Sequence, residues 1–232
     1  MGFGHLALCP GDSCPARSHS FEQSIFMLAG ELLVELADRE VSLAVGDTIR
    51  LPVAVAYALR NEGADAARWI EMAAPQPRTD PDLPPDTFVV GTGAAAPAGP
   101  EEGDDVLVLR AADPKTGDRR SRSVGDAVER IDHLSLQMLV EHPLGLHSMF
   151  IADAGPGAYL GPHDHPHEEA YLMLEGRCEW TFDGKAYLLQ AGDVAWSGVG
   201  TIHAMHNVTD EPCRWLETQA PMPAARHAIR YF

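Results

Sequence analysis

The segment GPHDHPHEEAYLMLEG, residues 161–176, carries three histidines and three glutamates around the start of an apolar run. His163 and His165 are two residues apart, so a β-strand would place both imidazoles on the same face. Pro166 interrupts a strand ladder and favours a turn, after which Glu169 opens the next strand. The segment therefore predicts two strands joined by a turn, with metal-ligand side chains on both.

Short apolar runs separated by Gly, Asp and Pro continue along the chain, and few segments keep a helical period. The runs are IFMLAG, ELLVELA, AYLMLEG, CEWTF and AYLLQAG. Asp183-Gly184, between the last two runs, is a strong hairpin signal because glycine accepts the positive φ of a tight two-residue turn. Many short strands at this spacing predict an all-β sandwich or barrel.

An internal repeat relates the two halves of the chain. When 146 is added to each position in the first half, matching residues coincide without a gap. The matches include Gly11 with Gly157, His19 with His165, Gly30 with Gly176, Asp47 with Asp193, Asn61 with Asn207, Trp69 with Trp215, Glu71 with Glu217 and Pro75 with Pro221. Because chance would not hold one register through turns and strands alike, the halves are predicted to be duplicated domains of one fold.

The composition changes between residues 76 and 125, where PQPRTDPDLPPDTF and GTGAAAPAGPEEGDD are rich in Pro, Gly, Ala and acidic residues. This composition is typical of a linker, in which VLVLR (106–110) is the one expected strand. We therefore expect an N-terminal domain over residues 1–75, a linker over residues 76–125 and a C-terminal domain over residues 126–232.

The chain of 232 residues has a formal net charge of -17, which argues against nucleic acid or an anionic membrane as partner because both would be repelled. It contains no apolar run long enough to span a membrane, and its N-terminus lacks the features of a signal peptide. The four cysteines are scattered, with none in a C-x-x-C pair, and are expected to be reduced structural thiols. We expect a cytoplasmic protein.

Two glycine-bounded patterns in the second half identify a family. The first is G-x5-H-x-H-x3-E-x6-G, from Gly157 to Gly176, and the second is G-x5-G-x-G-x2-H-x3-N, from Gly192 to Asn207. Together they resemble the two-part signature of the cupin superfamily, except that Gly198 stands where the signature has a turn proline. The resemblance implies a bicupin, with two jelly-roll barrels, or double-stranded β-helices, in one chain. It also implies a divalent metal inside the C-terminal barrel, bound by His163, His165, Glu169 and His203.

The chemistry of this ligand set limits which metal ions can bind. Three neutral imidazoles and one carboxylate suit Mn, Fe, Co, Ni, Cu or Zn, whereas Ca and Mg prefer oxygen-rich shells. Four protein ligands around a six-coordinate metal leave two positions for water, a bidentate substrate, or substrate with dioxygen. His167 and Tyr171 are weaker catalytic candidates, because a solvated turn and barrel lining are the favoured interpretations of these residues. The sequence predicts one transition metal per chain and leaves its identity open.

The ligand places of the first half hold different residues. The offset puts Arg17 at the place of His163, His19 at that of His165, Gln23 at that of Glu169 and Tyr57 at that of His203. Since one ligand of four remains, this degenerate barrel is predicted to be metal-free. The favoured interpretation is a retained scaffold. The alternative is a small pocket in which Arg17 pairs with an acid group of a ligand and Tyr57 donates a hydrogen bond.

Three classes of function stay open for the metal barrel. Dioxygenase-like or other oxidoreductase chemistry is implied by resemblance to quercetinase, oxalate oxidase and oxalate decarboxylase. A non-redox isomerase, lyase or hydrolase, such as ureidoglycine aminohydrolase, is the second class, although His163 and Glu169 depart from that family's ligand order. The third is metal-anchored binding without turnover. We favour a metal-dependent enzyme for a small-molecule substrate, with oxidoreductase chemistry ranked first, and expect a homodimer because barrel edges often pair with a second copy.

Overall fold

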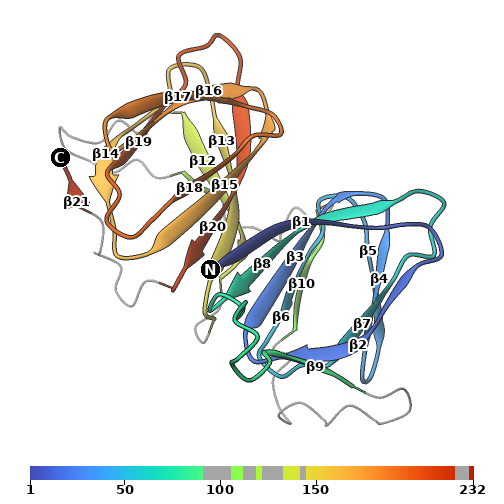
Figure 1. Ribbon diagram of the computed structural model, residues 1–232. Coiled ribbons are helices and arrows are strands. Elements are labelled where there is room, and N and C mark those ends of the chain that lie inside the picture. The colour runs from blue at the N-terminus through green and yellow to red at the C-terminus, as the bar shows by residue number, and fades with distance from the viewer. Residues whose placement is uncertain (91–105, 112–118, 122–132, 142–144, 223–229) are drawn as a thin grey trace. The chain divides into compact units, whose positions relative to one another are not determined.

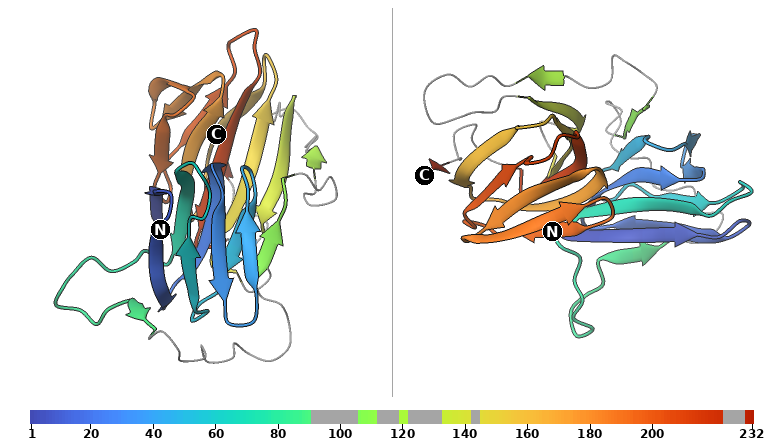
Figure 2. Two further views of the ribbon diagram at one scale, coloured as in Figure 1. Left: turned by 90° about the vertical axis from the view of Figure 1, so that its right-hand side faces the viewer. Right: turned by 90° about the horizontal axis from the view of Figure 1, so that it is seen from above.

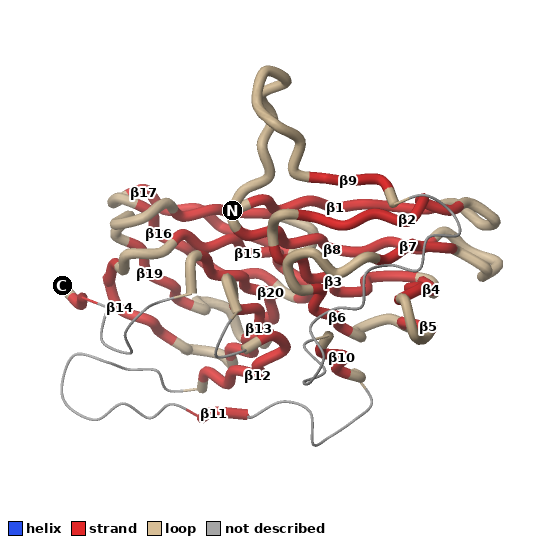
Figure 3. Tube along the Cα trace, turned by 90° about the horizontal axis from the view of Figure 1, so that it is seen from below, coloured by secondary structure: helices blue, strands red, loops and turns tan. Residues whose placement is uncertain are grey.

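The computed structural model describes residues 1–90, 106–111, 119–121, 133–141, 145–222 and 230–232. Within these residues the regular secondary structure consists of β-strands, as the red segments of Figure 3 show. No helix that is long and apolar enough to cross a membrane occurs in the described part of the chain. The chain divides into two compact units, Met1–Thr116 and Gly117–Phe232, coloured blue to green and green to red in Figure 1.

The first unit is built from two antiparallel sheets. One has the order β1-β8-β3-β6-β10 and the other the order β5-β4-β7-β2-β9. The strands are β1 (Gly2–Leu8), β2 (Ser13–His19), β3 (Glu22–Ala29), β4 (Leu32–Leu36), β5 (Glu40–Leu43), β6 (Thr48–Leu51), β7 (Tyr57–Arg60), β8 (Ala67–Ala74), β9 (Thr87–Val89) and β10 (Leu107–Leu109). Both sheets contribute apolar side chains to one core, which includes Ile25 and Trp69 from the first and Val34 and Leu59 from the second.

The second unit repeats this plan, as the further views of Figure 2 show. Its sheets have the orders β11-β12-β13-β20-β15-β18 and β17-β16-β19-β14-β21. The strands are β11 (Arg119–Ser121), β12 (Leu134–Val140), β13 (Ser148–Ala154), β14 (Tyr159–Asp164), β15 (Glu168–Glu175), β16 (Arg177–Phe182), β17 (Lys185–Gln190), β18 (Val194–Ser197), β19 (His203–His206), β20 (Cys213–Ala220) and β21 (Arg230–Tyr231). The rings of Trp180 and Trp215 meet edge to face across this core, with centroids 5.3 Å apart.

The two units share strand pairing residue by residue. Gln23 pairs with Leu51 between β3 and β6, and Glu169 pairs with Ser197 between β15 and β18. Gly30 and Gly176 turn the chain after β3 and β15 with φ of 69° and 68°, in the left-handed region that glycine adopts without strain. The prediction of an all-β chain with two duplicated jelly-roll barrels is therefore confirmed.

The segment predicted as a linker, residues 76–125, contains three short strands in the part that the structure describes. Strand β9 pairs with β2 and β10 pairs with β6, both in the first unit, while β11 pairs with β12 in the second. The strand expected at residues 106–110 is present as β10. Most of the remaining segment, residues 91–105, 112–118 and 122–125, lies outside the described residues. The described parts of this segment thus add β9 and β10 to the sheets of the first unit and β11 to a sheet of the second.

Candidate metal centre

The predicted ligands come together inside the second unit from separate parts of the chain. His163 lies near the end of β14, Glu169 near the start of β15 and His203 at the start of β19, while His165 follows β14 directly. Antiparallel pairing of β14 and β19 places His163 opposite His203. All four residues are at most 5% exposed. The strand alternation argued from the sequence is what turns these side chains inward.

The ring nitrogens and the carboxylate are close enough to share one ion. Ligand atoms of His163, His165 and His203 lie within 4.8 Å of one another. His165 Nε2 is 2.9 Å from Glu169 Oε1, and His203 Nε2 is 3.2 Å from Glu169 Oε2. His165 and Glu169 also form a second group with His167. The structure therefore gathers one carboxylate and four imidazoles around one buried point.

Backbone carbonyls fix which nitrogen each ring presents. His163 Nδ1 lies 2.8 Å from Gly161 O, His165 Nδ1 2.9 Å from His167 O, and His203 Nδ1 3.0 Å from Thr201 O. A nitrogen that faces a carbonyl must carry the proton, so Nε2 of each neutral ring keeps its lone pair. The Nε2 of His165 is buried without a well-directed hydrogen bond. These inward lone pairs and the carboxylate fit a divalent transition metal.

The electrostatics favour an ionised Glu169 and a neutral His163, while burial of His165 is outweighed by its contacts with Glu169 and the backbone, which together raise the pKa of His165 above its ordinary value. Burial opposes the charge of Glu169, but contacts from His165, His167 and His203 outweigh it and hold the pKa of this carboxyl well below its ordinary value. Burial and the neighbouring His203 lower the pKa of His163 to about 4, so its ring is neutral near pH 7. A metal binds neutral imidazole and carboxylate, and both forms are present.

His167 and Tyr171, the two weaker candidates, are both buried beside Glu169. The solvated turn favoured for His167 is wrong, because the residue is 3% exposed and its ring stacks on His165 with centroids 3.7 Å apart. The proline that precedes it turns the chain back into the barrel rather than outward. Tyr171 belongs to the apolar core, as expected of barrel lining, and its hydroxyl donates a hydrogen bond to Glu169 Oε2.

Sequence reasoning missed two polar residues that contact this carboxylate. Gln219 Nε2 donates to Glu169 Oε1 at 2.7 Å and to Glu217 Oε1 at 3.1 Å. Burial and the nearby charge of Glu169 raise the pKa of Glu217 well above its ordinary value. Trp215 Nε1 donates to Glu217 Oε2 at 3.0 Å. Trp215, Glu217 and Gln219 are spaced two residues apart along β20, which puts their side chains on one face of the sheet. This spacing was the sequence signal that could have identified them.

In the first unit, the corresponding residues are tied to one another. His19 Nε2 lies 2.9 Å from the Tyr57 hydroxyl and His19 Nδ1 lies 2.9 Å from Thr87 Oγ1. The Tyr57 hydroxyl donates to Gln23 Oε1, and the Arg17 guanidinium lies 5.6 Å from the centre of the Tyr57 ring. Both ring nitrogens of His19 thus have hydrogen-bond partners on other side chains, whereas Nε2 of His165 in the second unit has no well-directed hydrogen bond.

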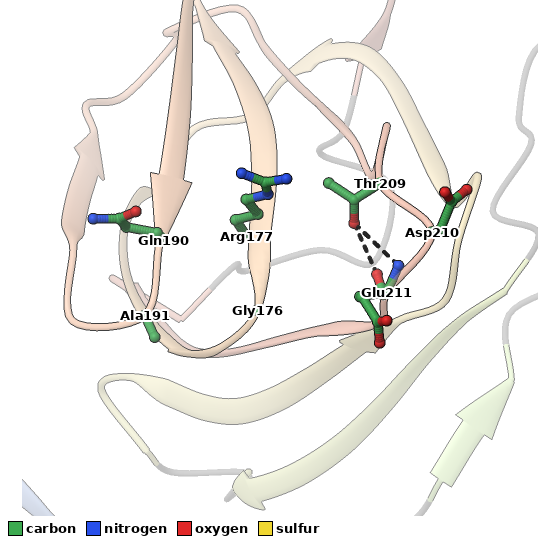
Figure 4. A pocket seen from close by; sticks show the side chains of 7 residues that line it. All are labelled: Gly176, Arg177, Gln190, Ala191, Thr209, Asp210 and Glu211. Atoms are coloured by element: carbon green, nitrogen blue, oxygen red, sulfur yellow. Dashed lines mark hydrogen bonds between the residues drawn. The ribbon is translucent and has the colours of Figure 1, made fainter.

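One surface hollow lies away from the histidine cluster. It has a volume of about 610 Å³ and is lined by Gly176, Arg177, Gln190, Ala191, Thr209, Asp210 and Glu211 (Figure 4). Gly176 follows the end of β15, whereas Glu169 is near its start, so roughly 23 Å of extended strand separates them. A second hollow, of about 320 Å³, includes His203 among its lining residues.

Comparison with protein families identifies the class of protein. The Cupin domain family matches residues 4–73 and 150–218, one stretch in each unit and more than half of the chain. The chain therefore belongs to this family, and its two barrels make it a bicupin.

Two curated proteins match part of the chain. Polyketide synthase CurC of Streptomyces cyaneus is 32% identical over 83 residues, which are 34% of this chain and 54% of CurC. A gentisate 1,2-dioxygenase of a Streptomyces species is 36% identical over 66 residues, which are 25% of this chain and 18% of the dioxygenase. The match thus spans about half of the first relative and less than a fifth of the second.

Solved structures share the fold at low sequence identity. AerE from Microcystis aeruginosa superposes with a TM-score of 0.65 at 17% identity, over 94% of this chain and 86% of AerE. Salicylate 1,2-dioxygenase from Pseudoaminobacter salicylatoxidans, in a structure of its adducts with gentisate, gives a TM-score of 0.66 at 14% identity, over 98% of this chain and 70% of the enzyme. These similarities establish the shared bicupin fold.

We predict that His19 makes the first unit sensitive to acid. Burial, together with Arg17, lowers the pKa of His19 to about 4, while its ordinary value is 6.5. Between these values the unfolded chain binds the extra proton, so stability falls as the pH drops from about 6.5 toward 4. His19→Gln should therefore lose less stability than the wild type between pH 7 and pH 5, measured by urea denaturation. The exposed His5, replaced in the same way, is the control, and an unchanged pH dependence in His19→Gln would contradict the assignment.

Proposed function

We propose that this bicupin is a metal-dependent enzyme for a small-molecule substrate, with dioxygenase-like or other oxidoreductase chemistry in the second unit. His163, His165, Glu169 and His203 would hold the metal. The observation that carries the proposal is the buried cluster of three imidazoles, each with Nδ1 at a backbone carbonyl, two of which also contact the Glu169 carboxylate. When bound, a metal of the series Mn, Fe, Co, Ni, Cu or Zn would supply a Lewis acid and, for redox-active ions, a site for dioxygen.

The neighbouring residues hold the carboxylate in place. Tyr171 donates to one oxygen of Glu169, and Gln219 donates to the other at 2.7 Å. Each oxygen keeps a lone pair for a metal after accepting one hydrogen bond. We therefore assign Tyr171 and Gln219 to positioning Glu169. His167 lies 3.4 Å from Glu169 Oε1 and is the side chain available to replace a ligand or to move a proton.

The names of relatives suggest substrates to test. Gentisate occurs in the name of one curated relative and in the description of one solved neighbour. Gentisate and salicylate carry a hydroxyl beside a carboxylate, a pair that can occupy two adjacent positions on a metal. Aromatic hydroxy acids are therefore the first substrate class we propose. The match to CurC supports a second candidate, a non-redox enzyme that acts on a polyketide.

We also propose a homodimer that forms through strand β18. Among the described strands β18 is the edge of its sheet, and Val194 and Trp196 on it are 54% and 62% exposed. In the first unit the equivalent edge, β6, is paired with β10. An open edge with a large exposed aromatic favours pairing with a second copy. Trp196→Glu should shift sedimentation from dimer to monomer, and an unchanged sedimentation coefficient would count against this interface.

Metal binding tests the site directly. His165→Ala should reduce the bound metal from about one ion per chain to near zero, because it removes the one imidazole that belongs to both groups of candidate ligands. His19→Ala, at the equivalent place of the first unit, is the matched control and should keep the wild-type content. Plasma emission on dialysed samples gives the ratio. Metal retention in His165→Ala would refute the assignment, and a loss of about half in His19→Ala would show that both units bind.

Oxygen uptake separates the two candidate reactions. The Fe(II)-loaded wild type, mixed with gentisate, salicylate or related hydroxy acids, should consume dioxygen, measured with an electrode, and His203→Ala should not. Turnover of a polyketide by the Zn-loaded protein without oxygen uptake would instead establish the non-redox candidate. Metal binding without turnover of either class would leave the function as metal-anchored binding.

A further inference from the structure

The short strand β21 lies along the strand that carries His163. Its two residues pair antiparallel with β14, so that Tyr231 is opposite His163 and Arg230 is opposite Asp164. The Phe232 amide donates a hydrogen bond of 2.9 Å to Pro162 O, which extends the pairing by one residue. In Figure 1, β21 is the red segment beside β14. This pairing adds a strand to the sheet where it borders the predicted metal ligands.

Side chains of β21 also contact β14, at His163 and at the neighbouring Asp164. The Arg230 guanidinium donates to both oxygens of Asp164, from Nε at 2.8 Å and from Nη2. Asp164 lies between His163 and His165 in sequence, and its side chain is 3% exposed. The ring of Tyr231 stacks on the His163 imidazole, with centroids 5.5 Å apart and planes at 29°. The Arg230–Asp164 ion pair with two hydrogen bonds and the stacked Tyr231 ring therefore fix both the orientation of β21 and its distance from β14.

The first unit has the same added strand with other contacts. Strand β9 pairs with β2, so that Val89 is opposite Arg17 and Thr87 is opposite His19. There Thr87 Oγ1 is 2.9 Å from His19 Nδ1, whereas in the second unit that nitrogen of His165 faces a backbone carbonyl. Val89, in the place of Tyr231, is 72% exposed. Both units thus have an added strand beside the histidine-bearing strand. In the second unit this strand places an aromatic ring, Tyr231, on a predicted ligand, whereas the first unit has Val89 at that place.

We propose that Tyr231 and Arg230 are positioning residues that hold His163 and its strand in the geometry for metal binding, an inference that rests on the proposed metal site. The Gly161 carbonyl fixes one nitrogen of His163, and the Tyr231 ring covers the face of the imidazole and limits its rotation. The Arg230–Asp164 pair holds β21 against β14, which keeps Tyr231 in place. Partners that orient a ligand commonly change metal affinity by 10–100-fold.

Metal affinity of substituted proteins tests this role. Tyr231→Leu and Arg230→Gln should each bind Co(II) about tenfold more weakly than the wild type, measured by competition with a chromogenic chelator. The visible spectrum of the Co(II)-loaded Tyr231→Leu protein should also shift, because the His163 ligand is less firmly oriented. Tyr231→Phe keeps the ring and should bind as the wild type. Val89→Ala, at the matching place of the first unit, is the control and should not change affinity.

The outcomes separate this inference from the proposed function. If the wild type binds no Co(II), the metal site itself fails. If the wild type binds and both Tyr231→Leu and Arg230→Gln bind equally well, the positioning role alone is overturned. Lower thermal stability of the metal-free variants with unchanged affinity would also overturn it, since β21 would then only stabilise the sheet. If Tyr231→Leu does not fold, Arg230→Gln decides the test by the same two measurements.

Discussion

The buried carboxylate of Glu169 is the group around which the second unit is arranged. Burying a charge costs several kcal/mol unless partners compensate, and here the compensation comes from imidazoles, a phenol and an amide on surrounding strands. Those partners reach the carboxylate because the sheets face each other and alternate side chains point inward. A metal would complete the same arrangement, since it binds the lone pairs that the rings already direct at this carboxylate.

The two units show how one fold keeps or loses such a centre. Where the second unit has Glu169, the first has the neutral amide of Gln23, so this position carries no charge that would draw imidazoles together. The first unit fills the space with hydrogen bonds among His19, Tyr57 and Gln23. It nevertheless keeps an apolar core and the same register between equivalent strands, as in β3 with β8 and β15 with β20. The scaffold therefore does not depend on the ligands, which is why they can diverge while the barrel persists.

The added strands β9 and β21 explain why sequence reasoning described the site only in part. Each has only two or three residues, so neither is long enough to show a period that a pattern search can detect. Their pairing partners are distant in sequence, and only the closed sheet brings them beside the histidine-bearing strands. His167 was misjudged for a related reason, because a polar turn can bend into a barrel as well as toward water.

Sequence alone determined the duplicated all-β architecture, because strand alternation, glycine turns and the 146-residue offset are local or repeated patterns. The resemblance of two such patterns to the cupin signature implied the four candidate ligands. Only the tertiary structure decided the surroundings of those ligands. It showed Gln219 and Tyr171 on the Glu169 carboxylate, His167 stacked on His165, and Tyr231 stacked on His163. Such contacts depend on which strands become neighbours when the sheets close, and a linear pattern does not contain that information.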